Sequence, residues 1–135
     1  MITTFELFNH SRSANGFDSF EGFVGTDEKD GAHEMIQDGN FATQSGYAER
    51  LHDYLRHRES LSLLGHVQKV KLVESDAIKT LPAYLEAHPE PAMSLVHFDM
   101  DIYKPTVESL NMLKPHLTKG SIVVLDEAVS RVSTQ

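Results

Sequence analysis

Apolar residues in the second half of the chain fall into blocks typical of strands and helices in alternation. Residues 67–75 and 93–99 are β-rich runs, and residues 119–127 contain an uninterrupted apolar run. The segments between them, 76–88 and 104–117, read as helices. Strand, helix, strand, helix, strand in this order predicts an α/β fold, with a mainly parallel sheet and flanking helices.

Acids and prolines mark the ends of these elements. Asp76 is placed to cap the first helix, and Pro82 predicts an early break or kink in it. Pro105 is expected at the first position of the second helix, where its missing N–H costs little, and Pro115 should end that helix. The apolar run 122–125 predicts a strand that is covered on both faces.

The first half of the chain is less regular. Residues 2–8 have helix-like apolar spacing, and residues 47–64 carry leucines and a tyrosine at helical intervals. Gly65 stands where that second helix would stop. Residues 17–33 mix aromatics with Gly, Asp and Ser, which predicts an irregular loop after a very short strand, with a solvated segment over 25–31.

Composition and net charge exclude several classes of protein. The 135 residues are 40% apolar and 24% charged, which predicts one globular domain over residues 1–135. A net charge of −8 argues against nucleic-acid and anionic-membrane surfaces. The absence of cysteine excludes disulfides and thiolate metal sites. Without a membrane-length apolar stretch or a secretory signal pattern, we expect a soluble cytoplasmic protein.

Two successive predicted strands end in acids: Asp99 and Asp101 follow one, Asp126 and Glu127 the other. Ligands of parallel sheets bind beyond the carboxyl ends of the strands, and neighbouring strands lie about 5 Å apart. Carboxylates that close require a proton or a cation, and hard oxygen ligands suit Mg²⁺. Alternatively, Asp101 simply caps the following helix.

The "DMD" sequence at Asp99–Asp101 also resembles the nucleophile strand of haloacid-dehalogenase-like phosphatases. Those proteins place a small residue and a threonine directly after the second aspartate, whereas Ile102 and Tyr103 stand here. A metal-dependent phosphatase is therefore a weaker hypothesis for the same residues.

Three segments together resemble a known group of enzymes: "GFDSFEGF" (16–23), "DAIKTLP" (76–82) and the long stretch 96–127. Their order and spacing are similar to those of the macrocin O-methyltransferase (TylF-type) group, which belongs to the class I S-adenosylmethionine-dependent methyltransferases. The resemblance implies a partial Rossmann-like methyltransferase sheet. It also implies methyl transfer from S-adenosylmethionine to a hydroxyl of a small, sugar-like molecule.

The same resemblance implies roles for four residues in binding the methyl donor. Asp18 and Ser19 fall at the end of the family's second strand, where an acid meets the donor's ribose. Ser75 and Asp76 follow the third strand, beside the adenine. From the residues alone, Asp18 reads as a loop-capping acid and Asp76 as a helix cap, and the cap and the binding role are compatible.

Asp99, Asp126 and Glu127 match the acids that hold a divalent ion, such as Mg²⁺, in metal-dependent members of the family. Glu127 replaces the more usual second aspartate. The ion would lower the pKa of the acceptor hydroxyl. Asp99 is the expected catalytic residue, either as a metal ligand or as the base that takes the hydroxyl proton.

The chain departs from the family pattern at both ends, so we expect a fragment. The family's first strand and its glycine-rich turn should precede "TTFELF" and are not found, and the final strands are not found either. That first strand lies between the second and fourth, so the sheet should be incomplete, with its edges open to a partner or to a second copy in a homo-oligomer. A catalytically inactive remnant or a partner-binding module is the alternative function.

Overall fold

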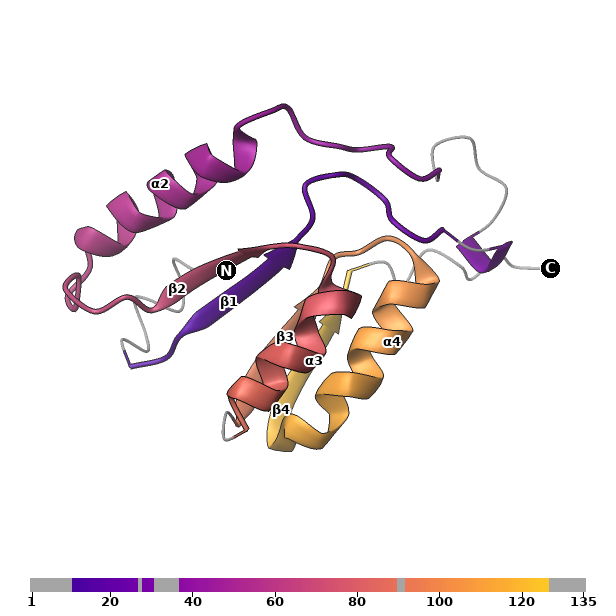
Figure 1. The fold of residues 1–135 in the computed structure, drawn as a ribbon. Helices are drawn as coiled ribbons and strands as arrows, with labels where there is room; N and C mark the ends of the chain where they lie inside the picture. The colour runs from indigo at the N-terminus through magenta and orange to yellow at the C-terminus, as the bar shows by residue number, and fades with distance from the viewer. Residues whose placement is uncertain (1–10, 27, 31–36, 90–91, 127–135) are drawn as a thin grey trace.

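The computed structural model describes residues 11–26, 28–30, 37–89 and 92–126. The helix expected over residues 2–8 lies outside the described residues. Figure 1 shows strands, α-helices and short 3-10 turns in this order: β1 (Ala14–Asp18), η1 (Glu28–Asp30), α2 (Tyr47–Ser60), β2 (Val70–Glu74), α3 (Ala77–Ala87), β3 (Met93–Phe98), α4 (Tyr103–Leu113), η2 (Lys114–His116) and β4 (Leu117–Leu125).

The strands pair in parallel, as the alternation of strands and helices predicts. β1 pairs with β2, and the register ends with Asp18 opposite Glu74. β3 pairs with β4, and Phe98 lies opposite Leu125. The expectation that the strands before Asp99 and Asp126 are neighbours is therefore confirmed, and so is the α/β class with a parallel arrangement and flanking helices.

The four described strands form two separate two-stranded sheets rather than one continuous sheet. Side chains join the two pairs. The Arg12 guanidinium donates a hydrogen bond of 3.5 Å to the carbonyl of Ala92, just before β3. The Phe17 ring of β1 meets the Tyr84 ring of α3 edge-on, with centroids 5.2 Å apart. Such aromatic contacts stabilise beyond the area that they bury.

The hydrophobic core lies between the β3–β4 pair and the two helices α3 and α4, which cover one face of that pair (Figure 1). Leu81 and Leu85 of α3, Phe98 of β3 and Leu113 of α4 form its buried centre. The other face of β4 is open, since Ile122 is 59% and Val124 37% exposed. The predicted burial of β4 on both faces is therefore wrong for the part of the chain that is described.

The helix ends follow the sequence signals in part. Asp76 caps α3 as predicted, with its carboxylate accepting a hydrogen bond from the Ile78 amide at 3.0 Å. The predicted break at Pro82 does not occur, and α3 continues through this residue. The proline removes only one intrahelical hydrogen bond, and its exposed ring faces solvent. α4 begins at Tyr103. Pro105 is thus its third residue, still within the turn whose N–H groups have no intrahelical acceptor.

A buried carboxylate connects the end of α2 to the start of β2. Glu59 Oε1 accepts hydrogen bonds from the backbone amides of Lys69 and Val70, the latter at 2.9 Å. The Lys69 ammonium donates to the Ser62 hydroxyl at 3.1 Å. Both charged residues are buried, and these bonds compensate their desolvation. None of the described helices is long and apolar enough to cross a membrane.

We expect Leu81→Ala to lower the free energy of unfolding by about 2–5 kcal/mol, because it removes a buried side chain and leaves a cavity. Leu81 is 4% exposed in the centre of the core. Leu63→Ala is the matched control, since Leu63 is 80% exposed. Urea unfolding followed by circular dichroism measures both, and equal losses in the two variants would contradict this description of the core.

Candidate functional site

A cavity of about 240 Å³ opens at the carboxyl ends of β1, β2 and β3. This is the edge at which ligands of parallel α/β sheets bind. The turn after β1, the starts of α3 and α4 and two loop segments form its walls. The lining residues are 17–20, 22–24, 41, 43, 75–77, 99–102 and 105.

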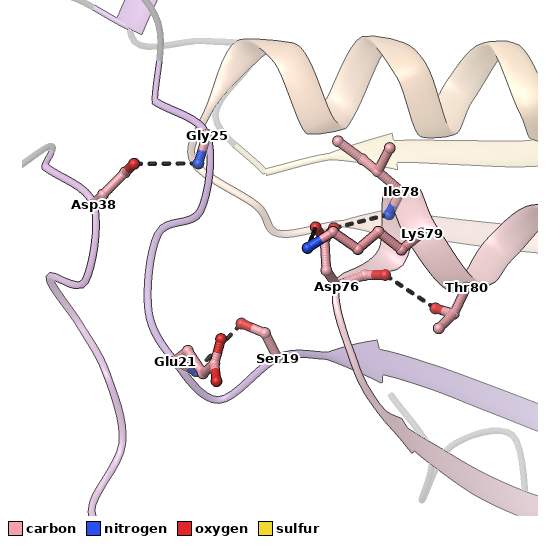
Figure 2. Close-up of polar contacts among 8 residues, drawn as sticks. All are labelled: Ser19, Glu21, Gly25, Asp38, Asp76, Ile78, Lys79 and Thr80. Carbon is pink, nitrogen blue, oxygen red and sulfur yellow. Dashed lines mark hydrogen bonds and ion pairs between the residues drawn. The ribbon is translucent and has the colours of Figure 1, made fainter.

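Asp18, the last residue of β1, and Ser19, which follows it, line the cavity. Asp18 Oδ1 accepts a hydrogen bond from the Phe20 amide at 2.8 Å. The Ser19 hydroxyl accepts one from the Glu21 amide at 3.2 Å, in the turn that Figure 2 shows. The loop-capping role read from the sequence is therefore present. Asp18 Oδ2 has no hydrogen-bond partner among the described residues.

Ser75 and Asp76 line the cavity beside that turn. The Ser75 amide donates to the Asp18 carbonyl at 2.9 Å, which extends the β1–β2 pairing and draws the two strand ends together. The Asp76 carboxylate is already engaged on its own helix (Figure 2). One oxygen caps Ile78, and the other lies 3.2 Å from the Lys79 ammonium. A ligand at Asp76 would have to share these contacts.

Asp99 and Asp126 follow the ends of β3 and β4. The Asp126 amide donates to the Phe98 carbonyl at 3.1 Å, so the pairing continues one residue beyond the strands. Asp99 lines the cavity, and Asp126 is not among the lining residues. Glu127 lies outside the described residues. Within those that are described, no three His, Asp or Glu side chains are grouped to hold a metal ion, so the Mg²⁺ site stays a prediction.

The start of α4 is capped by a residue that the sequence did not indicate. Asp30 is 5% exposed, and its Oδ1 accepts a hydrogen bond from the Tyr103 amide. The N-cap position falls on Ile102, so the alternative in which Asp101 caps this helix is wrong. Asp101 instead has a left-handed φ of 56°, a conformation that Asp adopts more readily than most residues. The predicted solvation of residues 25–31 is likewise wrong at Asp30.

The outer wall of the cavity consists of two loop segments, 20–26 and 37–43, which we call the two arms. They run antiparallel, and the Phe23 amide donates to the Asn40 carbonyl at 3.0 Å. Gly22 allows this approach. Its φ is +82°, and an added Cβ would lie 2.1 Å from the Asn40 carbonyl oxygen. A side chain at this position would force the arms apart.

A single carboxylate closes the other end of the arms. Asp38 Oδ1 accepts hydrogen bonds from the Gly25 amide at 3.1 Å and from the Thr26 amide at 3.0 Å. It also accepts one from the Thr26 hydroxyl at 2.8 Å. Figure 2 shows Asp38 reaching across to Gly25 from the opposite arm. The backbone and side-chain bonds from Thr26 hold the pKa of Asp38 below its ordinary value.

The parallel strand pairs, flanking helices and strand-end cavity define a partial Rossmann-like fold of the class I methyltransferase type. Solved structures carry this conclusion. The chain matches the crystal structure of CalS11, a calicheamicin methyltransferase, with a TM-score of 0.85 and 39% identity over 92% of this chain. It matches the apo structure of CalS11, a TDP-rhamnose 3′-O-methyltransferase of calicheamicin biosynthesis, with a TM-score of 0.70 and 34% identity over 92% of this chain.

The chain spans about half the length of both solved structures, 49% of the first and 45% of the second. No protein-family model matches it, and no curated protein does.

We expect the amide resonances of Gly25 and Thr26 to shift as Asp38 is protonated, with a midpoint below the ordinary pKa of an aspartate. A lowered folded-state pKa means that the bonds from Thr26 are fully present above the ordinary pKa. They are lost as pH falls through the lowered pKa. A pH titration followed by two-dimensional ¹H–¹⁵N NMR measures the midpoint, and Asp38→Asn, which does not titrate, is the control. A midpoint at or above the ordinary pKa would show that the hydrogen bonds from Gly25 and Thr26 to Asp38, here called the Asp38 clamp, do not form in solution.

Proposed function

We propose that the chain provides the donor and acceptor sites of an S-adenosylmethionine-dependent O-methyltransferase, which acts on a hydroxyl of a sugar-like molecule. One observation carries the proposal: Asp18, Ser75 and Asp99, from the ends of three strands, line a single cavity. The likeness to CalS11, described as a TDP-rhamnose 3′-O-methyltransferase, supports the sugar-like acceptor.

The residues at the ends of β1 and β2 fit an adenosine group. Asp18 Oδ2 has no partner among the described residues, and a carboxylate oxygen accepts hydrogen bonds from the vicinal hydroxyls of a ribose. Ser75 and Asp76 also line the cavity, and backbone and side-chain oxygens there can accept a hydrogen bond from the adenine amine. The proposed donor-binding residues are Asp18, Ser19, Ser75 and Asp76.

When bound, the donor supplies a methyl group on a positively charged sulfur. The chain's own contribution is mainly alignment, because fixing donor and acceptor in line replaces a bimolecular encounter. Asp99 is the proposed catalytic residue, since it lines the cavity and a carboxylate there can take the proton of the acceptor hydroxyl. The turn after β1 and the two arms line the cavity in which these groups would meet.

A divalent cation such as Mg²⁺ is a further part of the proposal. Asp99 and Asp126 follow paired strand ends, and Glu127 is next in the chain, so the strand pairing and the sequence together offer three carboxylates as candidate ligands of one ion. When bound, the ion would lower the pKa of the acceptor hydroxyl. Asp99 then has two candidate roles, ligand and base.

The resemblance to the TylF-type group also suggests how the strands are completed. The described strands divide into two pairs, β1–β2 and β3–β4. We propose that a further parallel strand from outside the described residues belongs between β1 and β3, because unpaired backbone edges in a core are unfavourable. A homo-oligomer and a cytoplasmic location remain expectations from the sequence.

The donor site predicts tight binding of S-adenosylhomocysteine that depends on Asp18. Isothermal titration should give a dissociation constant at least about tenfold higher for Asp18→Ala, because two hydrogen bonds to a charged acceptor are lost. Asp53→Ala is the matched control, since Asp53 is an exposed acid on α2. If the wild-type chain gave no binding signal at millimolar S-adenosylhomocysteine, the result would contradict the proposal and favour a catalytically inactive remnant.

The metal site predicts binding of Mn²⁺, a spectroscopic substitute for Mg²⁺, that depends on Asp99. Electron paramagnetic resonance should show binding at least about tenfold weaker in Asp99→Asn, since losing even an outer-shell partner weakens metal binding by that factor. Asp53→Asn should bind as the wild type does. Equal Mn²⁺ affinities of the wild type, Asp99→Asn and Asp53→Asn would show that Asp99 is not a metal ligand. Asp99 would then act as the base alone.

A further inference from the structure

The two arms present aromatic side chains to the cavity, and the donor site proposed above does not use them. Phe23 and Phe41, one from each arm, both line the cavity. Their ring centroids lie 5.2 Å apart, and the ring planes are inclined at 54°. Phe41 is 65% exposed. Phe23 is half-buried, so Phe41 is the ring from which a ligand would remove the larger area from water, which is favourable for an aromatic side chain.

This aromatic pair is held in place by the backbone around it. The Phe20 carbonyl accepts hydrogen bonds from the Thr43 amide at 3.1 Å and from the Thr43 hydroxyl at 3.2 Å. The close approach at Gly22 fixes the distance between the arms next to Phe23. The main-chain positions of Phe23 and Phe41 are therefore set before a ligand arrives, which lowers the entropy that binding would otherwise lose.

Another part of the lining of the same cavity has a different chemistry. Asp99 and Asp101, in the connection between β3 and α4, line it. A ligand that fills the cavity needs an apolar face towards the rings and hydroxyl groups towards the carboxylates. A hexose ring has both features, because its C–H groups form apolar patches on the ring faces and its hydroxyls project from the perimeter. A purely polar ligand would leave the rings exposed.

We propose that Phe23 and Phe41 form the sugar subsite of the acceptor and determine which acceptors bind. Their rings pack against the C–H face of the sugar, which turns a hydroxyl towards Asp99. The adenine of the donor lies elsewhere, beside Ser75 and Asp76. This inference rests on the proposed function, because it assigns the acceptor of that same reaction.

Binding measurements on the intact chain with two probes test the subsite. The probes are S-adenosylhomocysteine for the donor site and TDP-rhamnose, the sugar nucleotide named for a solved neighbour, for the acceptor site. In Phe41→Ala, we expect the dissociation constant of TDP-rhamnose to rise about tenfold, as for loss of one aromatic contact. The constant for S-adenosylhomocysteine should change less than about twofold. Phe41→Tyr keeps the ring and should bind both probes as the wild type does.

The remaining outcomes separate this inference from the proposed function. Unchanged binding of TDP-rhamnose to Phe41→Ala, or no binding to the wild type, overturns the sugar subsite while S-adenosylhomocysteine binding upholds the methyltransferase. Weaker binding of S-adenosylhomocysteine alone also overturns it, because the rings would then stack on the adenine. If the wild type does not bind S-adenosylhomocysteine, the proposed function itself fails. Thermal unfolding of each variant confirms that it is folded.

Discussion

The parallel direction of both strand pairs is the constraint on which the site depends. Because β1 runs parallel to β2, the acid that ends β1 and the loop after β2 lie at one edge, where the Ser75 amide donates a hydrogen bond to the Asp18 carbonyl. β3 and β4 bring Asp99 and Asp126 together in the same way. An antiparallel pairing would place each acid at the opposite edge from its partner, and the chain would have no shared cavity at the strand ends.

The elements of the fold could be predicted because their signals are local. Apolar periodicity and the Asp76 cap act within a few residues, and from residue 47 onwards the described part of the chain has the strands and helices that they indicate. The errors arise from contacts that are distant in sequence. The open face of β4 depends on which elements reach it, and the burial of Asp30 depends on the Tyr103 amide, 73 residues away. No local pattern contains that information.

The strand-end half of the site could also be anticipated, since a general rule places ligands beyond the carboxyl ends of parallel strands. Asp18, Ser75 and Asp99 do line one cavity. The aromatic half could not, because phenylalanines in irregular loops have no periodicity and read as packing residues. Only the folded arms show that Phe23 and Phe41 meet at the mouth of that cavity.

The way in which the arms are joined has a consequence for the evolution and engineering of such a protein. Main-chain hydrogen bonds, the Gly22 contact and the Asp38 clamp set their geometry, so most side chains on them do not define the shape of the loop. Substitutions at those positions should therefore change the side chains that face the cavity and leave the main-chain geometry of the arms in place. The chain thus combines a constant backbone scaffold with a loop wall whose side chains can be exchanged, and a library of variants could be built on that wall.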